Sequence, residues 1–356
     1  MGHADGRGFT VIELGLGVAA LTTGLAVFGP AASSIRGNGL DARSGFVHHE
    51  LGRRQFMYMG DHNGDFTGPN TSGSEWNKEP LGDPGMFPNK GLETLYGDTG
   101  GGNPTSQGDW LTPLVGDSYG FSANRAERMR QKFDVVADPT AGAMVDALYV
   151  GDVPEDIDDF ERVFNEQGYR QQSFLMMRSF THFSSEQRSS AIVLDQKNGY
   201  FYRELFAVQS PGSVALSPEA YSPNIMNVGM QLSNKVMFAD GTRFFNQGVL
   251  ELDVEVFNPR FSEDTSNGPV FDRSVAYGQG SPYALDGENL DLSYRKRGGA
   301  GMYATMFDGS LRYFSREESW TDPTPWYPSG SVWTGNGATA ESSAWVAENL
   351  PGGVIP

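Results

Sequence analysis

Residues 7–14 of this chain read Arg7-Gly8-Phe9-Thr10-Val11-Ile12-Glu13-Leu14, and they open an apolar run that ends at Phe28. Twenty helical residues rise about 30 Å, which matches the hydrocarbon core of a bilayer, so this run is long enough to span a membrane. Glu13 lies near the start of the run, where an unpaired carboxylate costs roughly 2.5–3.5 kcal/mol. The glutamate therefore requires a partner of opposite charge.

Two simple interpretations of this segment are a secretory signal peptide and an uncleaved anchor. The sequence Ala-Ala-Ser at residues 31–33 could serve as a signal-peptidase site, but Glu13 and the acidic Asp5 are atypical of a signal peptide. A plain anchor leaves Glu13 without a role. Pro30 follows the apolar run and must kink or end a helix there.

The same residues resemble the processing site of type IV prepilins and type II secretion pseudopilins. In that family a membrane-embedded prepilin peptidase cleaves after a glycine and methylates the new N-terminal phenylalanine. The resemblance implies that residues 1–8 are a leader, that Gly8 is its last residue and that Phe9 is the mature N-terminus. Glu13 then becomes the fifth mature residue. Pro30 becomes mature position 22 (30 minus 8), where many pilins carry a helix-kinking proline.

The resemblance also supplies a partner for Glu13. In the family this carboxylate is thought to meet the N-terminal amine of a neighbouring subunit, and pairing makes both buried charges tolerable. We therefore expect a structural filament subunit, not an enzyme, with no cofactor and no metal. The implied partners are the prepilin peptidase/methyltransferase, other pilin or pseudopilin subunits, and the inner membrane before assembly. The assembled subunit would lie in a periplasmic or cell-surface filament.

The composition describes the rest of the chain. Its 356 residues carry 44 Asp and Glu against 26 Lys and Arg, a net charge of −18, and show no basic run, so we expect no nucleic-acid partner. The absence of cysteine excludes disulfides and cysteine zinc sites. The histidines lack zinc-binding spacing, since His48 and His49 are adjacent. The 46 glycines and 20 prolines predict many turns, and hence an α+β fold with a long N-terminal helix on a β-rich, loop-rich head.

We divide the processed chain into three segments. Residues 9–29 form the membrane or assembly half of the N-terminal helix, residues 30–62 form its amphipathic half, and residues 63–356 form the extracytoplasmic head. Four residues at helical spacing predict a stripe that packs against the head: Val47, Leu51, Arg54 and Tyr58. Four glycines weaken this half of the helix: Gly37, Gly39, Gly45 and Gly52.

The residues after this helix raise the question of calcium binding. Asp61, Asn63 and Asp65 alternate like the start of an EF-hand loop, but Phe66 occupies the position of the required glycine and Ser72 that of the bidentate glutamate. A helix-ending turn is the simpler interpretation. The sequence alone leaves calcium binding open.

The head sequence predicts one clear helix and several strands. The helix covers residues 152–168, with Asp152 and Pro154 at its start and Gly168 at its end. Residues 67–110 are rich in Gly, Pro, Asn and Ser and predict a long loop. The predicted strands cover residues 173–183, 191–195, 235–245, 249–257 and 302–314.

Residues 236–245 and 305–314 look alike, because each has an Asp-Gly pair between two apolar stretches. This pattern is the strongest short hairpin signal, so we predict two hairpins. Their turn residues are Asp240, Gly241, Asp308 and Gly309. The second resembles the C-terminal hairpin of planctomycete-type prepilin-like proteins, in which a histidine lies one strand upstream. Gly298 occupies that position here, and the nearest polar residue is Arg297.

A membrane-anchored or secreted hydrolase or glycan-binding module is the alternative class. Residues 116–120, Gly-Asp-Ser-Tyr-Gly, match a nucleophile elbow with Ser118 as nucleophile, residues 111–115 as its strand and residues 122–133 as its helix. Only His182 lies downstream as a base, and no alternating strand–helix pattern surrounds the motif. Three aromatic residues, expected to be exposed, would suit a glycan-binding surface: Trp320, Trp326 and Trp333.

Overall fold

The computed structural model describes residues 37, 39–68, 78–81, 110–111, 113–115, 120–141, 146–149, 156–170, 173–184, 192–195, 200–204, 209, 211–241, 251–254, 264–265, 275–277 and 290–356. Gly8, Phe9, Glu13, Pro30 and Ser118 lie outside these residues. The described chain mixes helices with a largely antiparallel central sheet, which is an α+β architecture. No helix in these ranges combines the length and the apolar character needed to cross a bilayer.

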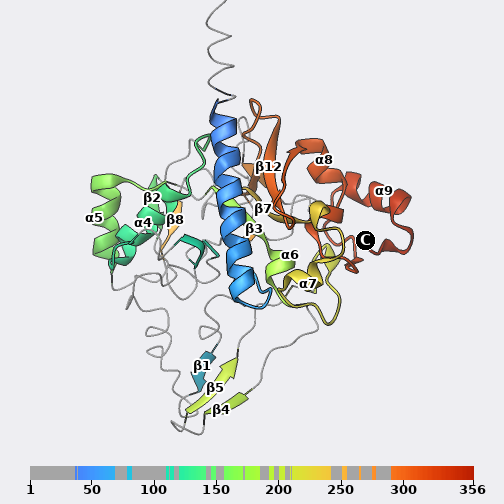
Figure 1. Ribbon diagram of the computed structural model, residues 1–356, viewed down its shortest axis with the longest axis horizontal. Coiled ribbons are helices and arrows are strands. Elements are labelled where there is room, and N and C mark those ends of the chain that lie inside the picture. Colours follow the sequence, from blue (N-terminus) through green and yellow to red (C-terminus); the bar gives the residue numbers. More distant parts are fainter. Residues whose placement is uncertain are drawn as a thin grey trace, which may run out of the picture.

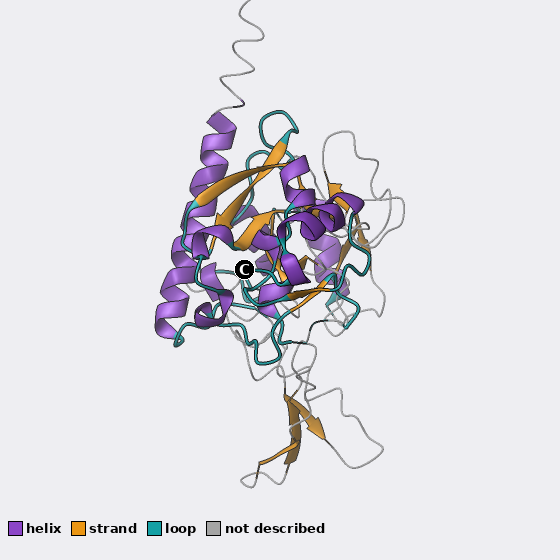
Figure 2. Cartoon of the chain, turned by 90° about the vertical axis from the view of Figure 1, so that its right-hand side faces the viewer, coloured by secondary structure: helices purple, strands orange, loops and turns teal. Residues whose placement is uncertain are grey.

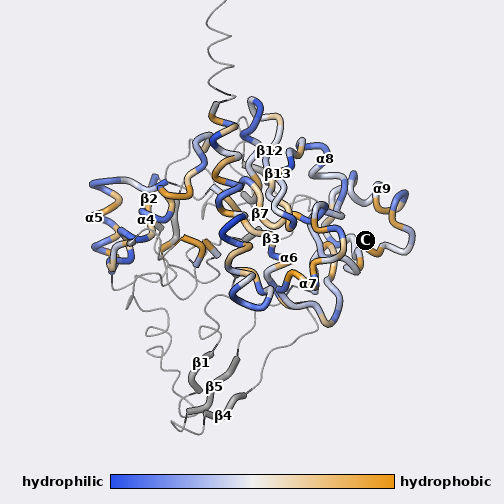
Figure 3. The backbone as a smooth tube through the Cα atoms, in the orientation of Figure 1, coloured by the Kyte–Doolittle hydropathy of each residue, from blue (hydrophilic) through white to orange (hydrophobic). Residues whose placement is uncertain are grey.

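A helix of residues 39–61 runs along one side of the molecule (Figures 1 and 2). Its tube alternates between hydrophilic and hydrophobic colours, as expected of an amphipathic helix (Figure 3). The helix ends where the Gly64 N–H donates to the Met59 carbonyl at 2.8 Å. Asn63 and Gly64 adopt positive φ values of 55° and 90°, which is typical of a helix C-terminal cap. The segment after the helix is therefore the helix-ending turn that we predicted.

The central sheet has the strand order β13-β12-β7-β3-β9. Its strands are β3 (Phe174–Met177), β7 (Val236–Asp240), β9 (Asp264–Thr265), β12 (Gly301–Met306) and β13 (Leu311–Ser315). Neighbouring strands are antiparallel except for the parallel pair β3 and β9. Every residue of β3 and β7 is buried, so these two strands form the centre of the fold.

The described residues also form smaller sheets and several short helices. The additional strands are β1 (Lys78–Leu81), β2 (Ala147–Tyr149), β4 (Ile192–Asp195), β5 (Tyr200–Glu204), β6 (Ala215–Leu216), β8 (Glu251–Asp253), β10 (Val275–Tyr277), β11 (Leu290–Ser293) and β14 (Val332–Trp333). The helices include α4 (Arg125–Val135), α5 (Ile157–Gln167), α6 (Arg178–Thr181), α7 (Ile225–Val228), α8 (Arg316–Thr321), α9 (Ala340–Asn349), η2 (Leu232–Asn234), η3 (Thr324–Trp326) and η4 (Pro351–Gly353).

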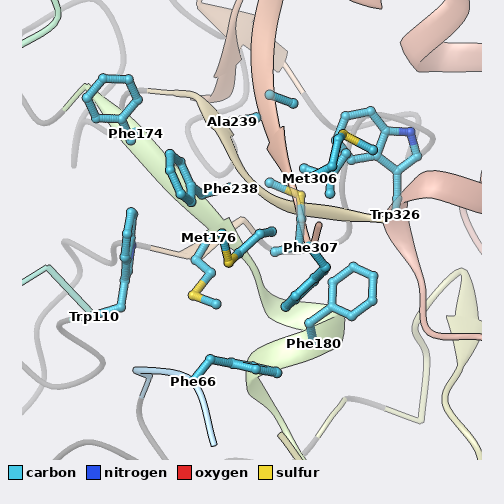
Figure 4. Close-up of a cluster of buried hydrophobic side chains, with 14 of the residues drawn as sticks. Phe66, Trp110, Phe174, Met176, Phe180, Phe238, Ala239, Met306, Phe307 and Trp326 are labelled. Carbon is cyan, nitrogen blue, oxygen red and sulfur yellow. The ribbon is translucent and has the colours of Figure 1, made fainter. Parts of the chain in front are cut away.

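The hydrophobic core forms two clusters. The larger one lies around the central sheet and is rich in aromatic rings (Figure 4). Phe307 lies near its middle, with ring centroids 5.3 Å from Phe66 and 5.0 Å from Phe180. The smaller cluster lies between α4 and α5, where Phe160 and Val163 of α5 are buried.

One of the two predicted hairpins is present. Strands β12 and β13 pair antiparallel through the loop that holds Asp308 and Gly309. The Gly309 N–H donates to the Met306 carbonyl at 2.9 Å, and Gly309 adopts φ 84°, which a residue with a side chain rarely adopts. This is a three-residue loop with glycine at its left-handed position.

The prediction of a turn at Asp240-Gly241 is wrong. Asp240 is the last residue of β7 and pairs with Phe174, and the Gly241 N–H donates to the Ser173 carbonyl at 3.0 Å. The pairing of β7 with β3 therefore continues through both residues. The physical reason is that the Asp240 carboxylate is buried in a polar cluster, whereas a turn would expose it. Residues 242–245, the predicted return strand, lie outside the described residues.

Other boundaries differ from the predictions by a few residues. The predicted helix 152–168 is described as α5, which begins at Ile157 and ends at Gln167, with Gly168 as the predicted C-terminal cap. Residues 152–155 lie outside the described range. The predicted strand 173–183 is shorter, because α6 begins at Arg178. Residues 113–115 are helical, so the strand proposed before Ser118 is wrong.

Candidate functional site

The helix of residues 39–61 presents a polar face to the sheet. Its buried residues are Ser44, His48, Leu51, Gly52, Gln55 and Met59. The predicted stripe shares only Leu51 with this set, while Val47, Arg54 and Tyr58 lie at its border and are half-buried. The stripe does pack against the head, as predicted. The centre of the buried face was not predicted, because serine, histidine and glutamine on a helix normally indicate a solvent-exposed face.

Two glycines let this helix approach the sheet closely. A Cβ atom added to Gly52 would lie 3.0 Å from Cγ2 of Thr305, and one added to Gly45 would lie 3.2 Å from Cδ2 of Leu311. By contrast, a Cβ added to Gly37, Gly39 or Gly60 would meet nothing within 4 Å. Gly45 and Gly52, which weaken the helix in isolation, therefore set its distance from β12 and β13.

His48 connects the helix to two strands of the sheet. Its Nε2 lies 3.2 Å from Oδ1 of Asp240, and its Nδ1 lies 3.0 Å from Oγ1 of Thr305. Because an ionised carboxylate only accepts hydrogen bonds, Nε2 carries a proton and donates it to Asp240. The ring also stacks on Phe238 at 5.5 Å and meets the edge of Phe174 at 4.8 Å. Contacts at both ring nitrogens and with two aromatic rings therefore fix the position of the imidazole.

Asp138 and Lys296 lie beside this histidine. Lys296 Nζ donates to Oδ2 of Asp138 and to Oγ of Ser44, and it donates to Oγ1 of Thr140 at 2.8 Å. Asp240 Oδ2 lies 3.5 Å from the same nitrogen. The side chains of Asp138, Asp240 and Lys296 have no exposed surface. A lysine amine and two carboxylates are therefore enclosed together beneath the helix.

Arg295 completes the charge balance. Its Nε lies 3.6 Å from Oδ2 of Asp138, and one of its terminal nitrogens lies 3.5 Å from Oδ1 of Asp240. Burial raises the pKa of Asp138, but the charges of Arg295 and Lys296 outweigh this effect and hold the pKa well below its usual range. Two acidic and two basic groups thus balance. We call Asp138, Asp240, Arg295 and Lys296 the buried charge cluster.

Sequence reasoning missed this cluster. Lys296 stands between Arg295 and Arg297, a setting typical of a solvated surface, and Asp240 is predicted to lie in a turn. Asp138 precedes a proline and carries no motif. Lys296 and Asp138 are 158 positions apart in the chain, so only the tertiary fold brings them together.

Among the described residues, the side chains considered for a hydrolase or glycan-binding function do not form a common site. Ser118 lies outside them. His182 is buried and lies 2.9 Å from Oγ1 of Thr181, and burial together with Arg178 holds its pKa well below the usual range. The expectation of exposed tryptophans is wrong. Trp326 is in the core, Trp333 is half-buried, and Trp320 is half-buried and donates to the Tyr294 hydroxyl at 2.9 Å.

Arg297 and Gly298, at the position of the family histidine, form part of a turn. Both adopt positive φ values, and the Arg297 guanidinium lies 3.9 Å from the centroid of the Tyr313 ring. This stacking is a structural contact between the turn and β13. Neither residue takes part in a polar cluster with the helix of residues 39–61 beyond a 3.3 Å bond from the Arg297 N–H to Asp41.

The geometry therefore marks the face between this helix and the sheet as the most elaborate polar site in the described part of the chain. Comparisons with models of protein families, with curated proteins and with solved structures gave no match to this chain.

Proposed function

We propose that this chain is a structural subunit of a type IV pilus-like or type II secretion pseudopilus filament, cleaved after Gly8 and N-methylated at Phe9. The observation that carries the proposal is the stretch from Gly8 to Leu14, with Glu13 at the fifth mature position. A carboxylate in an apolar run is costly unless a charge from another chain meets it. A staggered bundle of such helices provides that partner.

The packing of residues 39–61 supports this proposal. The segment is helical, buries one face on an antiparallel sheet and leaves the other face exposed along its length (Figure 2). In the proposal this segment continues the helix that begins at Phe9 and passes through the kink at Pro30. The sheet behind it and the buried charge cluster would hold the helix at a fixed angle to the head.

The outer face of the same helix suits contact with another helix. Phe46 and Met57 are exposed over 63% and 57% of their surfaces, and they lie 11 positions apart, which places them on one stripe. Gly39, Ala42 and Gly60 share this side of the helix and are exposed. Small residues beside large apolar ones permit close helix–helix packing. Neighbouring subunits in a filament would cover this stripe.

The decisive experiment is N-terminal mass spectrometry of the full chain produced together with a prepilin peptidase. We expect a mature protein that begins with N-methylated Phe9. A mature start at Ser34 would instead indicate a signal peptide, and an intact Met1 would indicate an anchor. Either result contradicts the proposal.

A second measurement separates processing from assembly. We expect Glu13→Ala to be cleaved and methylated normally but to be lost from the sheared filament fraction, because the neighbouring N-terminal amine then lacks a partner. Glu348→Ala is the matched control, since Glu348 is an exposed glutamate on α9, away from the helix of residues 39–61. Normal assembly of Glu13→Ala would contradict the pairing.

A further inference from the structure

The buried charge cluster holds an amine against a carboxyl group with a second carboxylate beside both. Lys296 Nζ contacts Oδ2 of Asp138, and Oδ2 of Asp240 lies 3.5 Å from Nζ. None of the three side chains is exposed. We propose that Lys296 and Asp138 condense into an intramolecular isopeptide bond and that Asp240 transfers the proton. The inference does not depend on the filament proposal.

The two oxygens of Asp138 are prepared for different roles. Oδ1 accepts hydrogen bonds from the backbone N–H and the hydroxyl of Thr140, both at 2.6 Å. Oδ2 accepts one from the Ser44 hydroxyl at 2.7 Å and contacts Lys296. When Nζ attacks Cγ, negative charge develops on Oδ1, where the two donors of Thr140 stabilise it as in an oxyanion hole. Oδ2 is then the leaving oxygen.

The reaction balances without a further reactant. The Lys296 ammonium first passes one proton to Oδ2 of Asp138, which leaves a neutral amine beside a neutral carboxyl group. The amine lone pair forms the bond from Nζ to Cγ of Asp138, and Asp240 accepts a second proton from Nζ. The C–Oδ2 bond then breaks as Asp240 passes that proton to the protonated Oδ2, which leaves as water. The products are one amide, one water molecule and Asp240 in its original ionised state.

The surroundings favour the condensed product. Burying an unscreened ammonium and a carboxylate costs free energy, and the amide removes both charges at once. Asp240 and Arg295 remain as a balanced pair 3.5 Å apart. The amide also lies away from bulk water, which hydrolysis would require. This chain has no cysteine, and the bond would close a loop over 158 positions of its sequence. It would thereby lower the conformational entropy of the unfolded chain, as a disulfide does.

Denaturing mass spectrometry of the full purified chain tests the bond directly. We expect a mass about 18 Da below that of the unmodified processed sequence, which corresponds to one lost water. Trypsin cannot cleave after an acylated lysine, so digestion should yield the dipeptide Lys296-Arg297 attached to the peptide of residues 133–162. An unchanged mass in folded protein overturns the proposal.

A water can also be lost when an Asp-Gly pair cyclises to a succinimide, and after residue 8 this chain has such pairs at Asp240-Gly241, Asp286-Gly287 and Asp308-Gly309. Location of the lost water at any of these pairs, without the branched peptide, likewise overturns the proposal. The branched peptide distinguishes these products because only the isopeptide bond joins residues 138 and 296.

Variants assign the roles. Lys296→Arg keeps a positive charge but cannot form the amide under these conditions, so it should show the full mass. Asp240→Asn should also show the full mass, because its amide cannot accept the second proton from Nζ. His49→Ala, on the exposed side of the helix, should keep the loss of one water. Retention of the branched peptide in folded Asp240→Asn would overturn the role of Asp240, and its retention in Lys296→Arg would overturn the assignment of Lys296.

Discussion

His48 shows how one residue can join the helix to the sheet. Its imidazole donates to Asp240 and accepts from Thr305, and it stacks on Phe238. Removal of the ring would leave a buried carboxylate and a buried hydroxyl without this partner and would also leave a cavity. Both effects are destabilising, since unsatisfied buried polar groups cost about 1–3 kcal/mol each.

We therefore expect His48→Ala to lower the free energy of unfolding by about 2–4 kcal/mol. Urea unfolding followed by circular dichroism measures the change. The adjacent His49 is exposed, so His49→Ala should change the free energy by less than about 0.5 kcal/mol. Equal effects of the two substitutions would contradict the role given to His48.

Lys235 is a buried amine outside the charge cluster. Its Nζ donates to the backbone carbonyls of Thr324, Tyr327 and Pro356 at 2.8, 2.9 and 2.7 Å. Burial lowers its pKa to about 8, although the charge of Asp322 partly opposes the shift. The unfolded chain, with an ordinary lysine pKa of 10.5, binds more protons than the folded chain between these two values.

The stability of the protein should therefore rise with pH from about pH 8 to pH 10, by up to about 1 kcal/mol per pH unit. Above that range the trend should reverse, because burial raises the pKa of Tyr294 to about 12 and the unfolded tyrosine ionises first. Thermal unfolding at a series of pH values measures both limbs. Lys235→Met should remove the rising limb, and an unchanged rise in that variant would refute the assignment.

At the scale of secondary structure, the helix of residues 39–61 depends on glycine for its approach to the sheet. Alanine normally stabilises a helix by about 1 kcal/mol relative to glycine. At Gly52 the added Cβ would meet Thr305 at 3.0 Å, a distance that forces the helix outward. The local preference of the helix and the packing of the interface therefore act in opposite directions at this residue.

We expect Gly52→Ala to destabilise the protein by about 1–2 kcal/mol, as overpacking does. Gly60→Ala is the matched control, because an added Cβ meets nothing there and should stabilise the protein by up to about 1 kcal/mol. Denaturant unfolding of the two variants should thus show shifts of opposite sign. A stabilising Gly52→Ala would show that the helix lies farther from β12 than described.

Individual elements could be predicted where their signals are local. The hairpin at Asp308-Gly309, the end of α5 at Gly168 and the turn after Asp61 follow from glycines at fixed positions. The same Asp-Gly signal failed at Asp240, where pairing of β7 with β3 overrides the turn preference. Strand register depends on distant partners, so a single sequence does not reveal it.

The same limit explains why the candidate site could not be predicted. Its carboxylates and its lysine come from separate segments, and each looks like a surface residue in its own neighbourhood. Only the stacking of the helix on a sheet of distant strands buries them together. The proposed processing site is the opposite case, because the resemblance that suggests it rests on consecutive residues from Gly8 to Leu14.

At the scale of the whole molecule, the filament proposal requires the exposed stripe of the helix to be buried between neighbouring subunits. Phe46 and Met57 contribute little to the folded subunit, since both are mostly exposed. We expect the double variant Phe46→Lys, Met57→Lys to fold with a free energy of unfolding within about 0.5 kcal/mol of the parent. Its recovery in sheared filaments should fall at least about tenfold, because burying two unpaired charges costs several kcal/mol.

The control for this experiment is Val354→Lys, which places a charge at another half-exposed apolar residue near the C-terminal end of the described chain (Figure 1). It should leave assembly unchanged. If the double variant assembles as well as this control, the outer stripe of the helix does not lie between subunits.

The position of β12 within the sheet has a consequence for the order of folding. Phe238 of β7 pairs with Met176 on one side and with Thr305 on the other, so one neighbour precedes it by 62 residues and the other follows it by 67. During synthesis β7 leaves the ribosome long before β12. Until β12 has followed, the helix of residues 39–61 cannot pack against the complete sheet. Contacts this distant in sequence also form slowly. The central sheet is therefore completed only after the chain has left the ribosome as far as Ser315, the last residue of β13.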